Sequence, residues 1–142
     1  MKMIKRIGIL TAGGDCPGLN AAIRAVGKAA LGCRGLEVVG IRDGFLGLIE
    51  ERFLPLDGST LANILTVGGT ILGTSRVKPH RMEIRGKTLD LRDVIVRNCK
   101  KHRLEALVCI GREDDCAGHP AAEPARDQLQ HRGGGRRRDG AR

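Results

Sequence analysis

The stretch RIGILTAGGDCPGLNAAIRAVGKAAL at residues 6–31 contains three successive patterns that decide the fold. Residues 6–11 are a short, mostly apolar run with β-branched side chains, which is typical of a buried strand. Residues 12–18 combine glycines, an aspartate and a proline, a composition that marks a turn. From Asn20 to Leu31, apolar residues recur at helical spacing. The stretch therefore predicts a strand, a glycine-rich loop and a helix.

The alternation of strands and helices continues to residue 111. Further strands are expected over 36–41 and 104–110, with a short one at Phe53 and Leu54 inside an ambiguous stretch, 42–57. Nearly continuous apolar strands that alternate with helices are typical of a parallel sheet covered on both faces. We therefore predict an α/β fold, a partial doubly wound parallel sheet of the Rossmann-like kind, with ligands at the carboxyl ends of its strands.

Two more helices complete the predicted elements. One follows Ser59, a residue type favoured as an N-cap, and runs through Leu65 until Gly68 and Gly69 break it. The other covers 91–99 and is finished by the basic residues 100–102. Positive charge there suits the negative end of a helix dipole.

The last 31 residues have a different composition from the rest. Residues 112–142 contain one leucine, Leu129, and no valine, isoleucine, methionine or phenylalanine, and they include a Gly-Gly-Gly-Arg-Arg-Arg run at 133–138. Such a segment cannot bury enough apolar surface to offset its chain entropy. We expect a folded unit over 1–111 and a Gly/Arg-rich, disordered tail over 112–142.

The net charge of +9 admits nucleic acid, acidic membranes or phosphorylated small molecules as partners. The tail holds seven arginines against six acidic residues, so nearly all of the excess charge belongs to residues 1–111. The aromatic residues are two phenylalanines, too few for the stacking platforms that bind bases. These features argue against nucleic acid as a partner.

No run of 18 apolar residues suggests a membrane-spanning helix, and the N-terminus does not look like a secretory signal. The five cysteines, at positions 16, 33, 99, 109 and 116, form no Cys-x-x-Cys pair. We expect buried free thiols in a reducing compartment, and hence a cytoplasmic protein.

Two loops at predicted strand ends carry candidate binding groups. In the first, Gly13 and Gly14 let backbone N–H groups approach an anion, although a turn of this kind is as often purely structural. The second, residues 68–79, combines glycines and hydroxyls with Arg76 and Lys78, a mixture suited to phosphate. Its alternative is a flexible surface loop with solvated cations. A third loop is expected after residue 110.

Four blocks, at 8–24, 40–48, 68–76 and 104–111, resemble in order and spacing the N-terminal motifs of the 6-phosphofructokinases. The sequence of residues 73–79 is most similar to that of the bacterial branch that contains ATP-using and pyrophosphate-using members. The resemblance implies the N-terminal part of that family's nucleotide-binding domain. It also implies phosphoryl transfer from ATP or pyrophosphate, with Mg²⁺, to the 1-hydroxyl of fructose 6-phosphate in glycolysis. The resemblance further implies that the full-length protein is a homo-oligomer, as full-length members of this family are.

The matching motif positions imply roles for particular residues. Gly13, with Gly14 beside it, would lie against the donor phosphates. Arg76 would hold the donor, with Val77 beside it at the nucleotide. The same resemblance matches Arg24 and Lys28 to basic residues of an effector-binding site in regulated bacterial members. Another arginine of that site is replaced here by Gly58.

After Gly111 the sequence departs from the family. Relatives continue with a Gly-Asp-Gly loop that holds the metal and later with a Thr-Ile-Asp-Asn-Asp catalytic segment, so no catalytic or metal-binding residue is assigned here. Codons can be chosen for residues 126–133 that, shifted by one base, encode Gly-Ile-Asn-Phe-Asn-Ile-Val-Gly, similar to the family's next strand. We expect a frameshifted tail and a chain inactive by itself. The alternative is a non-catalytic nucleotide-binding or regulatory fragment.

Overall fold

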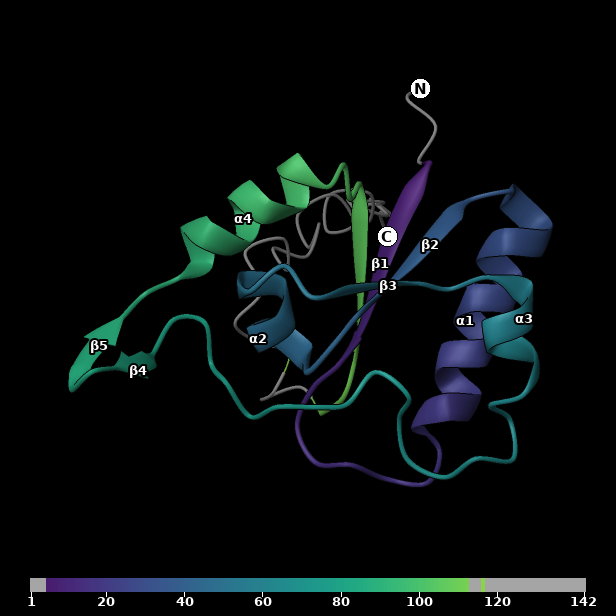
Figure 1. The fold of residues 1–142 in the computed structure, drawn as a ribbon, viewed down its shortest axis with the longest axis horizontal. Coiled ribbons are helices and arrows are strands. Elements are labelled where there is room, and N and C mark those ends of the chain that lie inside the picture. Colours follow the sequence, from purple (N-terminus) through teal and green to yellow (C-terminus); the bar gives the residue numbers. More distant parts are fainter. Residues whose placement is uncertain (1–4, 113–115, 117–142) are drawn as a thin grey trace, which may run out of the picture.

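The computed structural model describes residues 5–112 and 116. The predicted disordered tail therefore lies, apart from Arg112 and Cys116, outside the described residues. Helices and strands largely alternate along the described part of the chain. The main sheet lies between two groups of helices (Figure 1). This arrangement confirms the predicted α/β class.

The central sheet has four strands in the order β3-β2-β1-β6. Its strands are β1 (Arg6–Thr11), β2 (Glu37–Ile41), β3 (Phe53–Pro55) and β6 (Ala106–Ile110). β1 pairs in parallel with β2 and β6, so Ile9 lies between Gly40 and Val108. β3 runs antiparallel to β2, with Leu54 opposite Gly40. The predicted parallel sheet is confirmed for β1, β2 and β6, whereas β3 adds an antiparallel edge, because the short connection between β2 and β3 reverses the chain instead of crossing the sheet.

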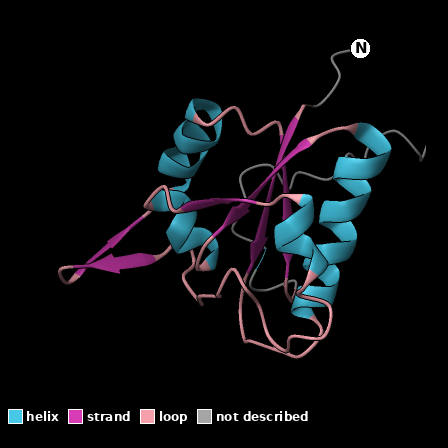
Figure 2. Ribbon diagram, turned by 45° about the vertical axis from the view of Figure 1, so that its right-hand side comes forward, coloured by secondary structure: helices cyan, strands magenta, loops and turns pink. Residues whose placement is uncertain are grey.

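Helices cover both faces of the sheet, as predicted (Figure 2). α1 (Leu19–Arg34) and α3 (Gly58–Ala62) pack on one face, and α2 (Gly44–Ile49) and α4 (Arg92–Lys101) on the other. Each face of the sheet has its own hydrophobic core, and alternate side chains of β1 point into the two cores. Ile7 and Ile9 pack with α1 and α3, whereas Leu10 packs with α2 and α4. No helix in the described part of the chain is both long and apolar enough to cross a bilayer.

Helix α2 was not expected from the sequence. Its six residues, GFLGLI, include two glycines, which are poor helix formers. Phe45 and Leu48 are almost completely buried between the sheet and α4, so packing rather than propensity holds the helix. The turn into it places Asp43 at φ 54° and Gly44 at φ 62°, in the left-handed region.

A small hairpin, β4 (Met82–Ile84) and β5 (Lys87–Leu89), was also unpredicted. It extends away from the body of the molecule (Figure 1). Its two-residue turn, Arg85-Gly86, has φ values of 50° and 76°, which suit a type I′ turn. Most of its side chains are exposed, so it lacks the hydrophobic alternation that reveals a half-buried strand.

The N-cap of α3 is Asp57, not the predicted Ser59. The Asp57 carboxylate accepts a 2.7 Å hydrogen bond from the Thr60 N–H, and the Ser59 hydroxyl donates to the same oxygen. The helix also ends at Ala62, earlier than predicted. Both residue types are good caps, and only the backbone direction at residues 57–59 distinguishes them.

We expect Asp57→Ala to destabilise the chain in a pH-dependent way. The hydrogen bonds from Thr60 and Ser59 lower the pKa of Asp57 from 3.8 to about 2. The ionised carboxylate therefore stabilises the fold above pH 3.8, and this contribution is lost as the pH falls from about 3.8 to about 2. Thermal unfolding should show a midpoint a few degrees lower for the variant at pH 7, with the gap closing in acid.

Ser59→Ala is the matched control for this prediction, because it removes only one of the two hydrogen bonds to the same carboxylate. It should cost less than Asp57→Ala at pH 7. Equal losses, or a gap between wild type and Asp57→Ala that stays constant down to pH 2, would contradict the assignment of the cap.

The cysteines differ from the sequence prediction. Cys109 and Cys116 form a disulfide, with their Cα atoms 6.2 Å apart, so the expectation of free thiols is wrong for this pair. Cys16 is free but exposed, not buried. Cys99 is free and half-buried, and burial raises the pKa of its thiol.

Candidate functional site

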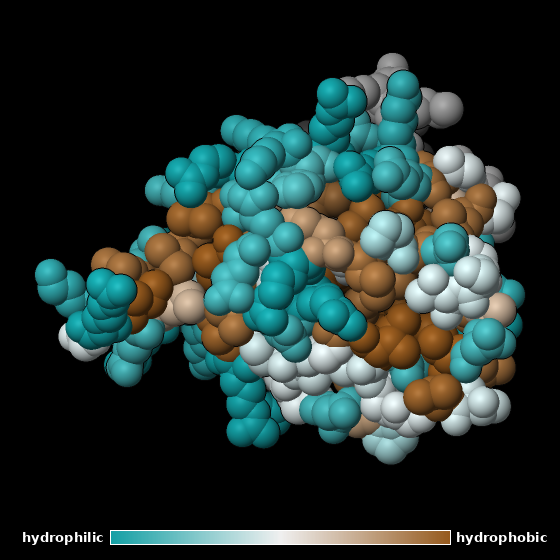
Figure 3. All heavy atoms as spheres, in the orientation of Figure 1, coloured by the Kyte–Doolittle hydropathy of each residue, from teal (hydrophilic) through white to brown (hydrophobic). Residues whose placement is uncertain are grey.

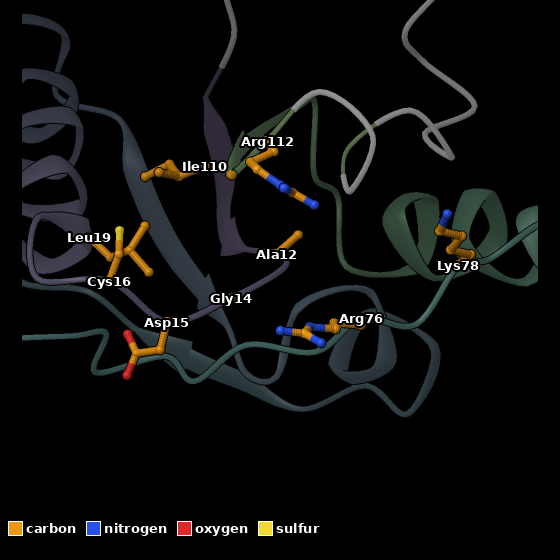
Figure 4. A pocket seen from close by; sticks show the side chains of 10 residues that line it. Ala12, Gly14, Asp15, Cys16, Leu19, Arg76, Lys78, Ile110 and Arg112 are labelled. Carbon is orange, nitrogen blue, oxygen red and sulfur yellow. The ribbon is translucent and has the colours of Figure 1, made fainter.

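Three loops meet at the carboxyl ends of β1 and β6 and enclose a pocket of about 840 Å³ (Figure 4). They are the loop after β1, the segment 68–79, and the residues that follow β6. The described lining is Ala12, Gly14, Asp15, Cys16, Leu19, Arg76, Lys78, Ile110, Gly111 and Arg112. The loop after β1 stands at a strand end, as expected, whereas the expectation that residues 68–79 follow a strand is wrong, because they follow α3 (Gly58–Ala62).

Gly13 joins the first loop to the second. Its φ of 90° is favourable only for glycine. Its N–H donates to the Ser75 carbonyl at 3.0 Å, and its carbonyl accepts from the Thr74 hydroxyl. Gly13 is buried and does not line the pocket, whereas the next residue, Gly14, is exposed and does. Gly13 therefore shapes the loop, and Gly14 presents backbone to the pocket.

A second set of hydrogen bonds fixes the segment 68–74 against β1. Thr11 is fully buried at the end of β1, and its hydroxyl contacts the Gly73 carbonyl at 2.6 Å and the Thr70 hydroxyl at 3.0 Å. Leu72 is buried against Gly40 of β2, where any side chain on residue 40 would collide with it. The segment is thus packed and hydrogen-bonded, which argues against the alternative of a flexible surface loop.

The pocket is electropositive. Arg76 extends toward the first loop, with its Nη2 atom 3.9 Å from the position that a Cβ on Gly14 would occupy (Figure 4). Lys78 and Arg112 add two more cations to the lining, against one carboxylate, that of Asp15. Arg76 and Lys78 are exposed and make no ion pair within the described residues. Their charge is therefore available to an anion.

The start of α1 contributes less than the sequence suggested. The Asn20 N–H donates to the Gly69 carbonyl at 2.9 Å, and the Leu19 N–H points to the Cys16 carbonyl at 3.4 Å. By contrast, the N–H groups of Gly14 and Asp15 have no partner among the described residues. The backbone donors for an anion are therefore in the loop before α1 rather than in its first turn.

The remaining predicted residues lie elsewhere. Val77 lines a smaller adjacent hollow of about 340 Å³, which begins at Arg76 and Lys78 and continues to Arg81 on the approach to β4. Arg24 and Lys28 lie on α1 and do not line either hollow. Along the edge of the molecule where the two glycine-rich loops run, the surface in Figure 3 is pale, as expected of small and weakly polar residues.

Sequence reasoning missed the roles of Asn20 and Thr11. Both are buried polar residues, 1% and 0% exposed, beside a loop. A polar residue that ends an apolar strand, or that opens a helix after a glycine-rich turn, indicates a buried hydrogen-bonding position. This pattern is present in the sequence, but it does not show which groups Asn20 and Thr11 bond to.

The described pocket does not fit a Mg²⁺ site on its own. Mg²⁺ prefers oxygen ligands and is usually held by one or two carboxylates together with phosphate oxygens. The lining supplies one carboxylate, Asp15, among three cations. Within residues 5–112 and 116, no three histidine, cysteine or acidic side chains are placed so that they could hold a metal ion together.

Fold and pocket together define an α/β protein of the doubly wound class, with a glycine-rich, cation-lined pocket at the carboxyl edge of its sheet. The family model described as Phosphofructokinase matches residues 6–127. The chain belongs to the phosphofructokinase family.

Particular relatives agree with this assignment. The chain is 57% identical over 109 residues to an ATP-dependent 6-phosphofructokinase of Propionibacterium freudenreichii, covering 77% of this chain and 29% of the relative. It is 47% identical over 116 residues to the enzyme of the same name from Vibrio cholerae, covering 82% of this chain and 34% of the relative. The chain thus spans about a third of the length of these relatives.

Solved structures show the same fold. The phosphofructokinase of Pichia pastoris superimposes with a TM-score of 0.64 at 35% identity, over 77% of this chain and 11% of that one. A pyrophosphate-dependent phosphofructokinase of Nitrosospira multiformis gives a TM-score of 0.67 over 80% of this chain and 28% of that one. Its identity of 17% supports the likeness of fold alone.

Proposed function

We propose that this chain forms the part of a phosphofructokinase that binds the phosphoryl donor. The observation that carries the proposal is the pocket where Arg76 faces the exposed backbone of Gly14, with Lys78 and Arg112 in the same lining. Backbone donors, a guanidinium fork and a second cation in one hollow suit a di- or triphosphate group. The curated relatives reported above are named ATP-dependent, and the resemblance of residues 73–79 to a branch with both kinds of member keeps pyrophosphate as a second candidate donor.

The geometry suggests how a polyphosphate would be held. The N–H groups of Gly14 and Asp15, which have no hydrogen-bond partner within residues 5–112 and 116, donate to one phosphoryl group, and Arg76 neutralises charge on the same or the next group. Lys78 stands on the other side of the opening (Figure 4) and extends the positive field toward the solvent. The adjoining hollow at Val77 can receive the remainder of a nucleotide.

In the whole protein, we propose transfer of a phosphoryl group to fructose 6-phosphate in the cytoplasm. Catalysis of this kind depends mainly on positioning and charge stabilisation. Residues 12–16 and 76–78 provide these on the donor side. We expect the 142-residue chain to bind the donor without turning it over, because the segments that the family resemblance assigns to the metal and the general base do not occur in its sequence.

Titration calorimetry with the 142-residue chain tests this proposal. Pyrophosphate and ATP should bind saturably, and pyrophosphate should bind roughly 10-fold more tightly than orthophosphate, because two phosphoryl groups reach more donors. Affinity should fall as salt is added. Binding no tighter than that of orthophosphate, or binding unchanged by salt, would contradict a polyphosphate pocket. Release of phosphate or formation of fructose 1,6-bisphosphate would show that the chain is active by itself.

A further inference from the structure

Asn20 stands at the second position of α1 and is 1% exposed. Its side-chain amide donates to the Val67 carbonyl at 2.9 Å, and its side-chain carbonyl accepts from the Ile71 N–H at 2.7 Å. Its own backbone N–H donates to the Gly69 carbonyl at 2.9 Å. One residue thus holds both ends and the middle of the five-residue segment 67–71.

That segment leads directly into the cation-bearing part of the pocket. After Ile71, the buried Leu72 anchors the chain on β2, and the next contacts, at residues 73–75, are those with β1 and Gly13. Arg76 follows immediately. Because Arg76 itself is exposed and makes no ion pair within the described residues, its position depends on the backbone that precedes it.

We infer that Asn20 is a positioning residue for donor binding: it clamps 67–71 onto α1 so that Arg76 stays opposite Gly14. The inference rests on the proposed function and adds to it a residue that does not line the pocket. Removing the amide leaves the Val67 carbonyl and the N–H of the half-buried Ile71 without the partner that ties them to α1, so the segment is free to rearrange. Arg76 then spends less time in the binding geometry.

The chain supplies a matched control in Asn98. It is 3% exposed on α4, and its side-chain amide donates to the Leu48 and Ile49 carbonyls at 2.9 and 3.0 Å. Asn98→Ala therefore removes an equally buried amide that bridges two segments, but away from the pocket. Both variants should lower the thermal midpoint, whereas only Asn20→Ala should weaken pyrophosphate binding.

A double-mutant cycle separates positioning from general destabilisation. We expect Asn20→Ala to raise the Kd for pyrophosphate roughly 10-fold and Asn98→Ala to change it less than about 2-fold. In an Arg76→Ala background, Asn20→Ala should add less than about 2-fold, because the group it positions is gone. If Asn20→Ala does not fold, Asn20→Ser, which keeps a small hydrogen-bonding side chain, is examined by the same cycle.

The outcomes are distinguishable. If the wild-type chain binds pyrophosphate and Asn20→Ala weakens it no more than Asn98→Ala does, the inference is wrong while the proposed function stands. Equal effects of the Asn20 substitution with and without Arg76 would likewise exclude action through Arg76. A wild-type chain that does not bind pyrophosphate would overturn both.

Discussion

Arg76→Glu should reduce the affinity of the chain for pyrophosphate by roughly 100-fold or more. A hydrogen bond to a charged group is worth about 1.5–3 kcal/mol, and the reversal adds repulsion between the new carboxylate and the phosphate. Arg76 is exposed, so the substitution should leave the thermal midpoint nearly unchanged. Calorimetric titration beside a thermal melt measures both effects on one preparation.

Arg97→Glu is the matched control. Arg97 is exposed on α4 and does not line the pocket. The two variants have the same net charge, so a difference between them cannot come from charge alone. If both weaken pyrophosphate binding equally, the affinity reflects the overall positive field of the chain, and the pocket is not the site.

Gly47→Ala should unfold the chain or come close to it. A Cβ on Gly47 would overlap the Arg42 carbonyl oxygen and lie 2.7 Å from its carbon atom. Backbone atoms cannot move aside as a flexible side chain can, and the Gly47 carbonyl is itself held by a 2.7 Å hydrogen bond from the Arg52 N–H, which follows α2. We expect a loss of about 3 kcal/mol or more, a large part of the stability of a small domain.

Gly32→Ala provides the contrasting case. Gly32 lies within α1, and no atom lies within 4 Å of the position of its Cβ. Alanine there should stabilise the helix by about 0.5–1 kcal/mol. Urea unfolding followed by circular dichroism compares the two variants. A Gly47→Ala chain as stable as Gly32→Ala would mean that the turn between β2 and α2 is not built as described.

Elements with strong apolar patterns were predictable from the sequence. β1, β2 and β6 are nearly continuous apolar runs, and α1 and α4 carry apolar residues at helical spacing; the structure confirms all five. α2 was missed because Gly44 and Gly47 lower its helix propensity, and tertiary packing of Phe45 overrides that preference. Likewise, the direction of β3 depends on the geometry of its connection rather than on the strand's own residues.

For the site, the sequence identified the candidate binding loops, but it did not determine the role of each residue in them. The rule that ligands bind at the carboxyl ends of strands accounts for residues 12–18, which follow β1, but not for residues 68–79, which follow α3 and reach this edge through tertiary contacts. It could not show that the Gly13 N–H is already bonded to Ser75, nor that Val77 faces a separate hollow. The clamp at Asn20 depends on contacts about 50 residues apart, which local patterns do not encode.

The most direct test is to map pyrophosphate onto the ¹⁵N-labelled chain by NMR. Amide shifts during a titration report where an anion binds, independently of any substitution. We expect saturable shifts concentrated at the amides of Gly14, Asp15 and Arg76, with a smaller change at Gly111 across the pocket. Shifts spread over basic residues away from these three loops, or no saturable shift at Gly14 and Arg76, would contradict a polyphosphate site at this edge of the sheet.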